Sequence, residues 1–207
     1  MLPKEHTLPL ILTYLRILAI PLFVAVLYVP ESWIAERTAN VVSMWIFILA
    51  AITDWADGYL ARRWNQTTPF GAFLDPVADK LMVAAALIVL TEKGFVDPLA
   101  TLIIISREIT ISALREWMAQ LGNAKSVAVN MLGKVKTVTQ LVAIPFLLFN
   151  GVLFGLFHTN PVGRVLIWIA ALITLWSMIV YLKAALRPAP ASSDGGEMAT
   201  IDNKIIK

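Results

Sequence analysis

The sequence predicts an all-α integral membrane protein, in which six transmembrane helices surround a polar active-site cavity that faces the cytoplasm. Of its 207 residues, 58% are apolar and only 15% are charged, and the mean hydropathy is +0.75. A soluble domain is closer to half apolar and a quarter charged. Apolar stretches of about 20 residues, the length that crosses the hydrocarbon of a bilayer, fit six times into this chain. Four aspartates gather within residues 54–79, in a chain that otherwise avoids charge over long runs.

The first expected span is the apolar run Leu8 to Val29, which follows a short polar lead, residues 1–7. It is not typical of a cleaved signal, because Arg16 interrupts it and no small-residue cleavage site follows. Arg16 has two interpretations of equal weight: a side chain that extends to the interface, or a ligand for a lipid or a diphosphate. The second span is expected from about Ala39 to Ala61, and residues 62–70 then turn the chain.

Four further spans are expected in the rest of the chain. A tight polar turn at residues 92–97 separates the third from the fourth, and polar and basic residues 121–136 precede the fifth. After Arg187 the composition changes to PAPASSDGG, which has no apolar period to bury. We therefore expect one membrane domain, residues 1–187, and a flexible polar tail, residues 188–207. The four expected spans are residues 75–90, 98–120, 137–157 and 162–186.

The distribution of Lys and Arg predicts the orientation. If six spans place both termini on one side, that side carries 14 of the 17 basic residues. The positive-inside rule then places the termini and the aspartates at the cytoplasmic face of a multi-pass protein in the cell (inner) membrane, in contact with its lipids. The net charge of +3 without a basic run gives no indication of nucleic-acid binding. The absence of Cys excludes disulfides and thiolate metal sites.

The four aspartates supply the candidate chemistry. On an ideal helix Asp54 and Asp57 share one face, and Asp75 and Asp79 lie one turn apart on a second helix. Each helix could therefore present two carboxylates to a pair of divalent cations. Hard oxygen ligands, with no Cys and only two distant His, favour two Mg²⁺ (or Mn²⁺) ions. Two such ions could clamp a diphosphate and polarise its phosphorus, which is the logic of phosphoryl transfer.

The pattern D-x2-D-G-x2-A-R-x8-G-x3-D-x3-D, complete from Asp54 to Asp79, resembles the signature of the CDP-alcohol phosphotransferases. With ISREITISALREWM and GKVKT, the chain is most similar to the bacterial branch that makes phosphatidylglycerophosphate, over most of residues 8–186. This resemblance implies transfer of the phosphatidyl group from CDP-diacylglycerol to sn-glycerol 3-phosphate, with release of CMP, in anionic phospholipid synthesis. It also implies a homodimer.

The resemblance assigns roles to single residues as well. Asp79 matches the general base for the acceptor hydroxyl, in addition to its place in the metal set. A plain ion pair of Asp79 with Lys80 or Arg107 stays open as an alternative. Three positions match contacts to the cytidine nucleotide of CDP-diacylglycerol, although small-residue helix packing would also explain the glycine. These three are Gly58, Arg62 and Thr68.

An acceptor that carries its own phosphate needs further cations beside the metal site. Four basic residues on the expected cytoplasmic side could bind it. The alternative is that they are interface anchors partnered by Glu108 and Glu116; for the two lysines of GKVKT the phosphate role is favoured. The four are Arg107, Arg115, Lys134 and Lys136.

Other functions fit parts of the pattern. Another CDP-alcohol phosphotransferase would use inositol phosphate or serine as its acceptor. An intramembrane prenyltransferase also pairs Asp motifs with Mg²⁺, but the DG-x2-AR core argues against it. A cation transporter would place its carboxylates nearer the bilayer midplane than the ends of two consecutive spans.

Overall fold

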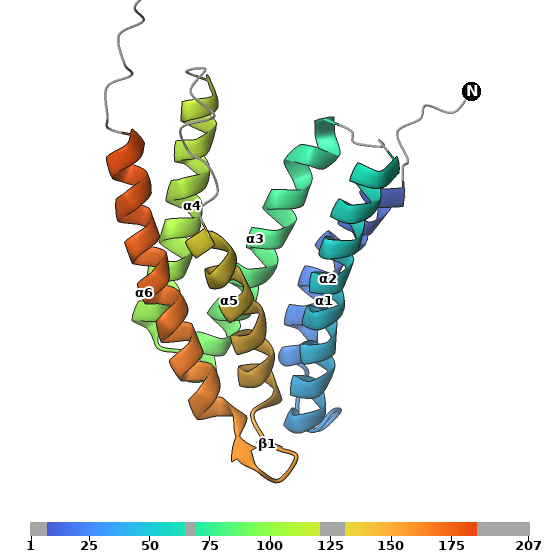
Figure 1. The fold of residues 1–207 in the computed structure, drawn as a ribbon. Helices are drawn as coiled ribbons and strands as arrows, with labels where there is room; N and C mark the ends of the chain where they lie inside the picture. The colour runs from blue at the N-terminus through green and yellow to red at the C-terminus, as the bar shows by residue number, and fades with distance from the viewer. Residues whose placement is uncertain (1–7, 65–68, 121–130, 186–207) are drawn as a thin grey trace, which may run out of the picture.

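The computed structural model describes residues 8–64, 69–120 and 131–185, and this part of the chain folds into six helices and one short hairpin (Figure 1). At some helix positions only the backbone is described, namely 8–10, 57, 58, 60–62, 64, 69, 72, 119, 131–134, 184 and 185. The elements are α1 (Leu8–Leu27), α2 (Glu36–Trp64), α3 (Pro69–Glu92), α4 (Pro98–Gln120), α5 (Met131–Phe149), β1 (Val152–Leu153), β2 (Phe157–His158) and α6 (Thr159–Ala185).

Each of the six expected helical segments is found as a helix, but four of them begin earlier than the sequence predicts, α2 and α6 by about three residues and α3 and α5 by about six. Helix α3 begins at Pro69 rather than near Asp75. Proline suits the first position of a helix, where its missing N–H has no partner to lose. Helix α5 begins at Met131 rather than at Thr137, because lysines are good helix formers and the polar stretch GKVKT continues the helix. The polar connection expected at residues 121–136 therefore ends where α5 begins, at Met131.

Helix α5 also ends earlier than predicted, at Phe149 rather than near Phe157. The backbone of Asn150 (φ 39°), Phe154 (φ 50°) and Gly155 (φ 73°) lies in the left-handed region, which stops the helix and closes a tight turn. Strands β1 and β2 pair antiparallel across this turn. The hairpin lies at one end of the bundle (Figure 1).

The helices form one bundle with an apolar interior. Helix α1 packs against α2 and α3, α5 packs against α2 and α6, and α4 packs against α6. The beginning of α1, the end of α6 and the end of α2 lie at the end of the bundle opposite the hairpin (Figure 1). Phe23, Phe47, Leu87 and Ile144 are fully buried between the helices. The bundle therefore has a buried apolar core between its helices.

The outer faces of the bundle are apolar too. Leu18, Trp45, Leu102, Leu172 and Trp176 are each more than half exposed. Helices that are apolar on all sides are typical of proteins in a membrane. Among the described residues, two stretches are long and apolar enough to cross one, Glu36–Ala56 and Thr159–Lys183, and two shorter apolar stretches are Ile11–Leu27 and Val135–Phe149. The composition and the outer faces together are those of a membrane protein.

Candidate active site

The first part of the site joins α1 to α2. Arg16 is buried inside the bundle, and its Nη1 atom lies 2.5 Å from Oδ1 of Asp54. The interpretation of Arg16 as a side chain that extends to the interface is therefore wrong. A buried cation that contacts the first aspartate of the motif offsets part of the cost of a carboxylate in an apolar bundle.

A second contact from α1 reaches α3. The buried hydroxyl of Thr13 donates a hydrogen bond of 2.5 Å to Oδ1 of Asp75. Thr13 and Arg16 are three residues apart and so share one face of α1. Thr13 is not among the site residues predicted from the sequence. Its spacing from Arg16, in an otherwise apolar span, is the signal that could have found it.

Asp79 lies where two neighbouring cavities meet. One cavity is lined by Arg16, Asp54 and Asp79, among apolar residues of α2, α3 and α5. The other is lined by Asp79 together with polar residues of α3, α4 and α5, including Lys136 and Gln140. Asp79 therefore lies between the cavity that contains Asp54 and the cavity that contains Lys136.

The described aspartates are close enough to influence one another. Asp54 and Asp79 line one cavity, and Asp75 lies one helix turn before Asp79 on α3. Like charges gathered in an apolar bundle, with oxygen as the only ligand atom, fit a hard divalent cation such as Mg²⁺. Among the described side chains, however, no three acidic or histidine residues come close enough to hold an ion. The fourth aspartate, Asp57, has its side chain outside the described residues, so the predicted metal set stays a prediction.

The expected nucleotide contacts also fall largely outside the described residues. Gly58 and Arg62 lie near the end of α2, at two positions where only the backbone is described, and Thr68 lies in the undescribed segment 65–68. The neighbouring Arg63 is exposed, and its Nη1 atom donates a hydrogen bond of 3.3 Å to the hydroxyl of Tyr59. The role of the three predicted residues toward the nucleotide stays a prediction.

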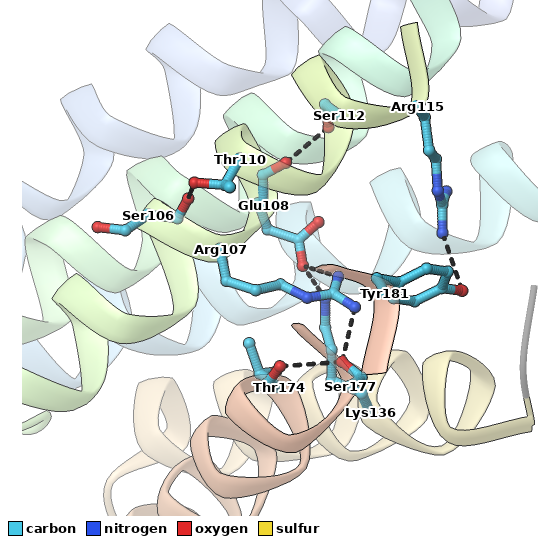
Figure 2. Close-up of polar contacts among 10 residues, drawn as sticks. All are labelled: Ser106, Arg107, Glu108, Thr110, Ser112, Arg115, Lys136, Thr174, Ser177 and Tyr181. Carbon is cyan, nitrogen blue, oxygen red and sulfur yellow. Dashed lines mark hydrogen bonds and ion pairs between the residues drawn. The ribbon is translucent and has the colours of Figure 1, made fainter. Parts of the chain in front are cut away.

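Two of the predicted phosphate-binding cations meet at one carboxylate (Figure 2). Lys136 on α5 is buried and forms an ion pair with Oε1 of Glu108 on α4. The Nη1 atom of Arg107, also buried, lies 3.5 Å from the same oxygen, and its Nη2 atom donates a hydrogen bond of 2.8 Å to Oγ of Ser177 on α6. Glu108 thus holds cations from two helices together.

Tyr181 on α6 connects Arg107 to the third predicted cation, Arg115. The guanidinium groups of Arg107 and Arg115 lie 6.0 and 5.5 Å from the centroid of the Tyr181 ring, within the range of cation–π attraction. Nη2 of Arg115 lies 3.5 Å from the tyrosine hydroxyl (Figure 2). The side chain of Lys134, the fourth predicted cation, lies outside the described residues. No sequence signal points to Tyr181, because a single aromatic residue in an apolar helix carries no information about its neighbours.

The sequence of this chain is similar to those of known proteins. Residues 6–176 match the sequence model of the CDP-alcohol phosphatidyltransferases. The CDP-diacylglycerol–glycerol-3-phosphate 3-phosphatidyltransferases of Salmonella typhimurium (strain LT2), Shigella flexneri and Escherichia coli (strain K12) are 51%, 50% and 49% identical over 185 residues. Each alignment covers 87% of this chain and 96% of the relative. The chain belongs to the CDP-alcohol phosphatidyltransferase family.

Proposed function

We propose that this protein transfers the phosphatidyl group from CDP-diacylglycerol to sn-glycerol 3-phosphate, giving phosphatidylglycerophosphate and CMP. The position of Asp79 carries the proposal, because this carboxylate lines both the cavity of Asp54 and the cavity of Lys136. A transferase of this kind needs one side for a diphosphate donor, another for a phosphorylated acceptor, and a base between them. The names and the high identity of the relatives support the same reaction.

The donor side is built on α2 and α3. In this proposal Asp54, Asp57, Asp75 and Asp79 would hold two Mg²⁺ (or Mn²⁺) ions, which supply positive charge beside the donor diphosphate when bound. Arg16 and Thr13 hold the Asp54 and Asp75 carboxylates in fixed orientations, as outer-shell hydrogen bonds do around ligands. The cytidine nucleotide would contact three residues near the end of α2 and in the segment that follows it, Gly58, Arg62 and Thr68.

The acceptor side is built on α4, α5 and α6. Glycerol 3-phosphate brings about two negative charges to a site that already receives a diphosphate, so cations must offset the repulsion. Lys136 and Lys80 line the cavity of Asp79. Arg107 lies beside Lys136 at Glu108, and Arg115 lies on the Tyr181 ring. Lys134, two residues before Lys136 on α5, is the fourth predicted phosphate ligand, and its side chain lies outside the described residues.

Asp79 links the two sides chemically. The C1 hydroxyl oxygen of glycerol 3-phosphate attacks the phosphorus of the phosphatidyl group, and Asp79 accepts the hydroxyl proton. The bond between this phosphorus and the bridging oxygen breaks, and that oxygen leaves as part of the CMP phosphate. A new phosphodiester forms as the diphosphate bond is lost, so charge and atoms balance without a further reactant.

We also propose that all six helices cross the cell (inner) membrane, with the active-site cavity facing the cytoplasm, that residues 1–187 form the membrane domain with residues 188–207 as a tail, and that the protein is a homodimer. Apolar outer faces and the shared location of the first and last helix ends support the crossing number (Figure 1). The excess of Lys and Arg at that end supports the orientation. The family resemblance supports the homodimer.

A reconstituted assay tests the reaction. Purified protein in detergent micelles, with CDP-diacylglycerol, Mg²⁺ and glycerol 3-phosphate, is expected to release CMP and phosphatidylglycerophosphate in equal amounts. Omission of either substrate is the control, and both products should then be absent. Release of CMP without the acceptor, or together with phosphatidic acid alone, would show a hydrolase and contradict the proposal.

A further inference from the structure

The side chain of Gln140 has a feature that the proposed reaction does not yet use. Gln140 lies on α5, is only 4% exposed, and lines the same cavity as Asp79 and Lys136. Its Nε2 atom has no hydrogen-bond partner within the described part of the chain. A buried amide donor without a partner is costly, so a native structure normally keeps one only where something else accepts its hydrogen bond.

The place of Gln140 on the helix indicates what that acceptor atom is. Lys136 and Gln140 are four residues apart and so lie on one face of α5, separated by about 6 Å along the helix axis. Asp79 on α3 lines the same cavity. The cavity is therefore lined by two cations, a candidate base and an amide donor, and one of the cations, Lys136, is paired with Glu108.

Glycerol 3-phosphate carries three polar groups: a phosphate, a C1 hydroxyl that reacts, and a C2 hydroxyl between them. Lys136 matches the phosphate and Asp79 matches the reacting hydroxyl, which leaves the C2 hydroxyl to be bound. We propose that Nε2 of Gln140 donates a hydrogen bond to the C2 hydroxyl oxygen of the acceptor, so that this residue selects acceptors with a hydroxyl next to the reacting carbon. The inference rests on the proposed function, in which glycerol 3-phosphate is the acceptor.

The test compares two acceptors in two proteins. The second acceptor is 3-hydroxypropyl phosphate, which lacks only the C2 hydroxyl. Wild-type protein should prefer glycerol 3-phosphate by about tenfold or more in kcat/KM, because a site built to bind a hydroxyl rejects the analogue without it. Gln140→Met keeps the length of the side chain but removes the donor. It should lower kcat/KM for glycerol 3-phosphate by about the same factor and change that for 3-hydroxypropyl phosphate by less than about twofold.

The matched control is Gln120→Met, the same change at an exposed position on α4, which should leave both acceptors unaffected. An equal loss on both acceptors in Gln140→Met would show a structural role and overturn the inference. Equal use of the two acceptors by the wild-type protein would overturn it as well, even if the variant did not fold. Failure of the proposed function is separate, because wild-type protein would then release no CMP with glycerol 3-phosphate at all.

Discussion

Lys136 on α5 forms an ion pair with Glu108 on α4, inside the cavity that Asp79 also lines. The lysine that the sequence assigns to the acceptor phosphate is thus held in place by a carboxylate of the protein (Figure 2). Glu108 fixes where the ammonium group lies, and it also keeps the buried cluster of Lys136 and Arg107 from being an uncompensated positive charge. An acceptor phosphate that binds here shares its cation with Glu108.

Removal of this cation should weaken acceptor binding. Lys136→Met keeps the aliphatic length, and it should raise the KM for glycerol 3-phosphate by about tenfold or more while the KM for CDP-diacylglycerol stays nearly unchanged. Lys134→Ala should act in the same direction. Lys183→Met, an exposed lysine on α6, is the control. Wild-type acceptor kinetics in both variants would require a phosphate pocket built from Arg107 and Arg115 instead.

The aspartates of the predicted metal set should each be essential. Asp54→Ala, Asp57→Ala and Asp75→Ala should lower turnover at least about 100-fold, because the loss of one ligand from a shared site disturbs both ions. Steady-state CMP release at low millimolar Mg²⁺ measures this. Asp97→Asn, an aspartate at the start of α4 that keeps its bond to the Leu99 N–H, is the control. Near-normal turnover in any of the three alanine variants would exclude the four-carboxylate site.

Asp79 should matter for chemistry more than for donor binding. Asp79→Asn keeps the size of the side chain and an oxygen, but it cannot accept the acceptor's proton. Turnover should fall by about 100-fold to 10,000-fold, the usual contribution of a general base, while CDP-diacylglycerol still binds. Binding of the donor by calorimetry in detergent, beside the CMP assay, separates the two effects. Turnover comparable to that of the wild type would remove Asp79 from the role of base.

The packing of α5 on α6 depends on Gly163. A Cβ atom at this position would lie 2.6 Å from Cγ of Leu147 and 3.3 Å from the backbone oxygen of Ala143. Gly163→Ala should therefore lower the free energy of unfolding by about 1–3 kcal/mol, the usual cost of overpacking a close contact. Thermal unfolding in detergent measures the change, and Val165→Ala on the outer face of α6 is the control. A variant as stable as the wild type would show that the two helices can separate at this point without cost.

The sequence is sufficient to predict the six helices, because apolar runs of membrane length are a strong local signal. The helix at residues 98–120 has the predicted bounds. The early end of α5 could not be predicted in this way. It depends on the left-handed backbone of Asn150 and Phe154, and neither Asn nor Phe in a sequence signals that conformation on its own. Local pattern could not have placed the short hairpin.

In the site, too, spacing along the chain is predictable from the sequence, whereas contacts between distant helices are not. The offsets of Asp54, Asp75 and Asp79 along the chain predict that these carboxylates face one another, and the structure places Asp54 and Asp79 on the wall of one cavity. The partner of Asp54, however, is Arg16, which is 38 residues away and on another helix. An arginine in an apolar span can either extend to the membrane interface or bind a group inside the bundle. The packing of α1 against α2 decides between these two, and spacing within one helix carries no information about that packing.

An acceptor competition tests the central claim most directly. Purified protein receives CDP-diacylglycerol and Mg²⁺ with glycerol 3-phosphate, glycerol, serine and inositol phosphate at equal concentrations, and the lipid products are identified by mass spectrometry. The site of Asp79, Lys136 and Arg107 predicts phosphatidylglycerophosphate as the dominant product, with no phosphatidylglycerol or phosphatidylserine. Phosphatidylserine or phosphatidylinositol phosphate as the main product would contradict the proposed acceptor.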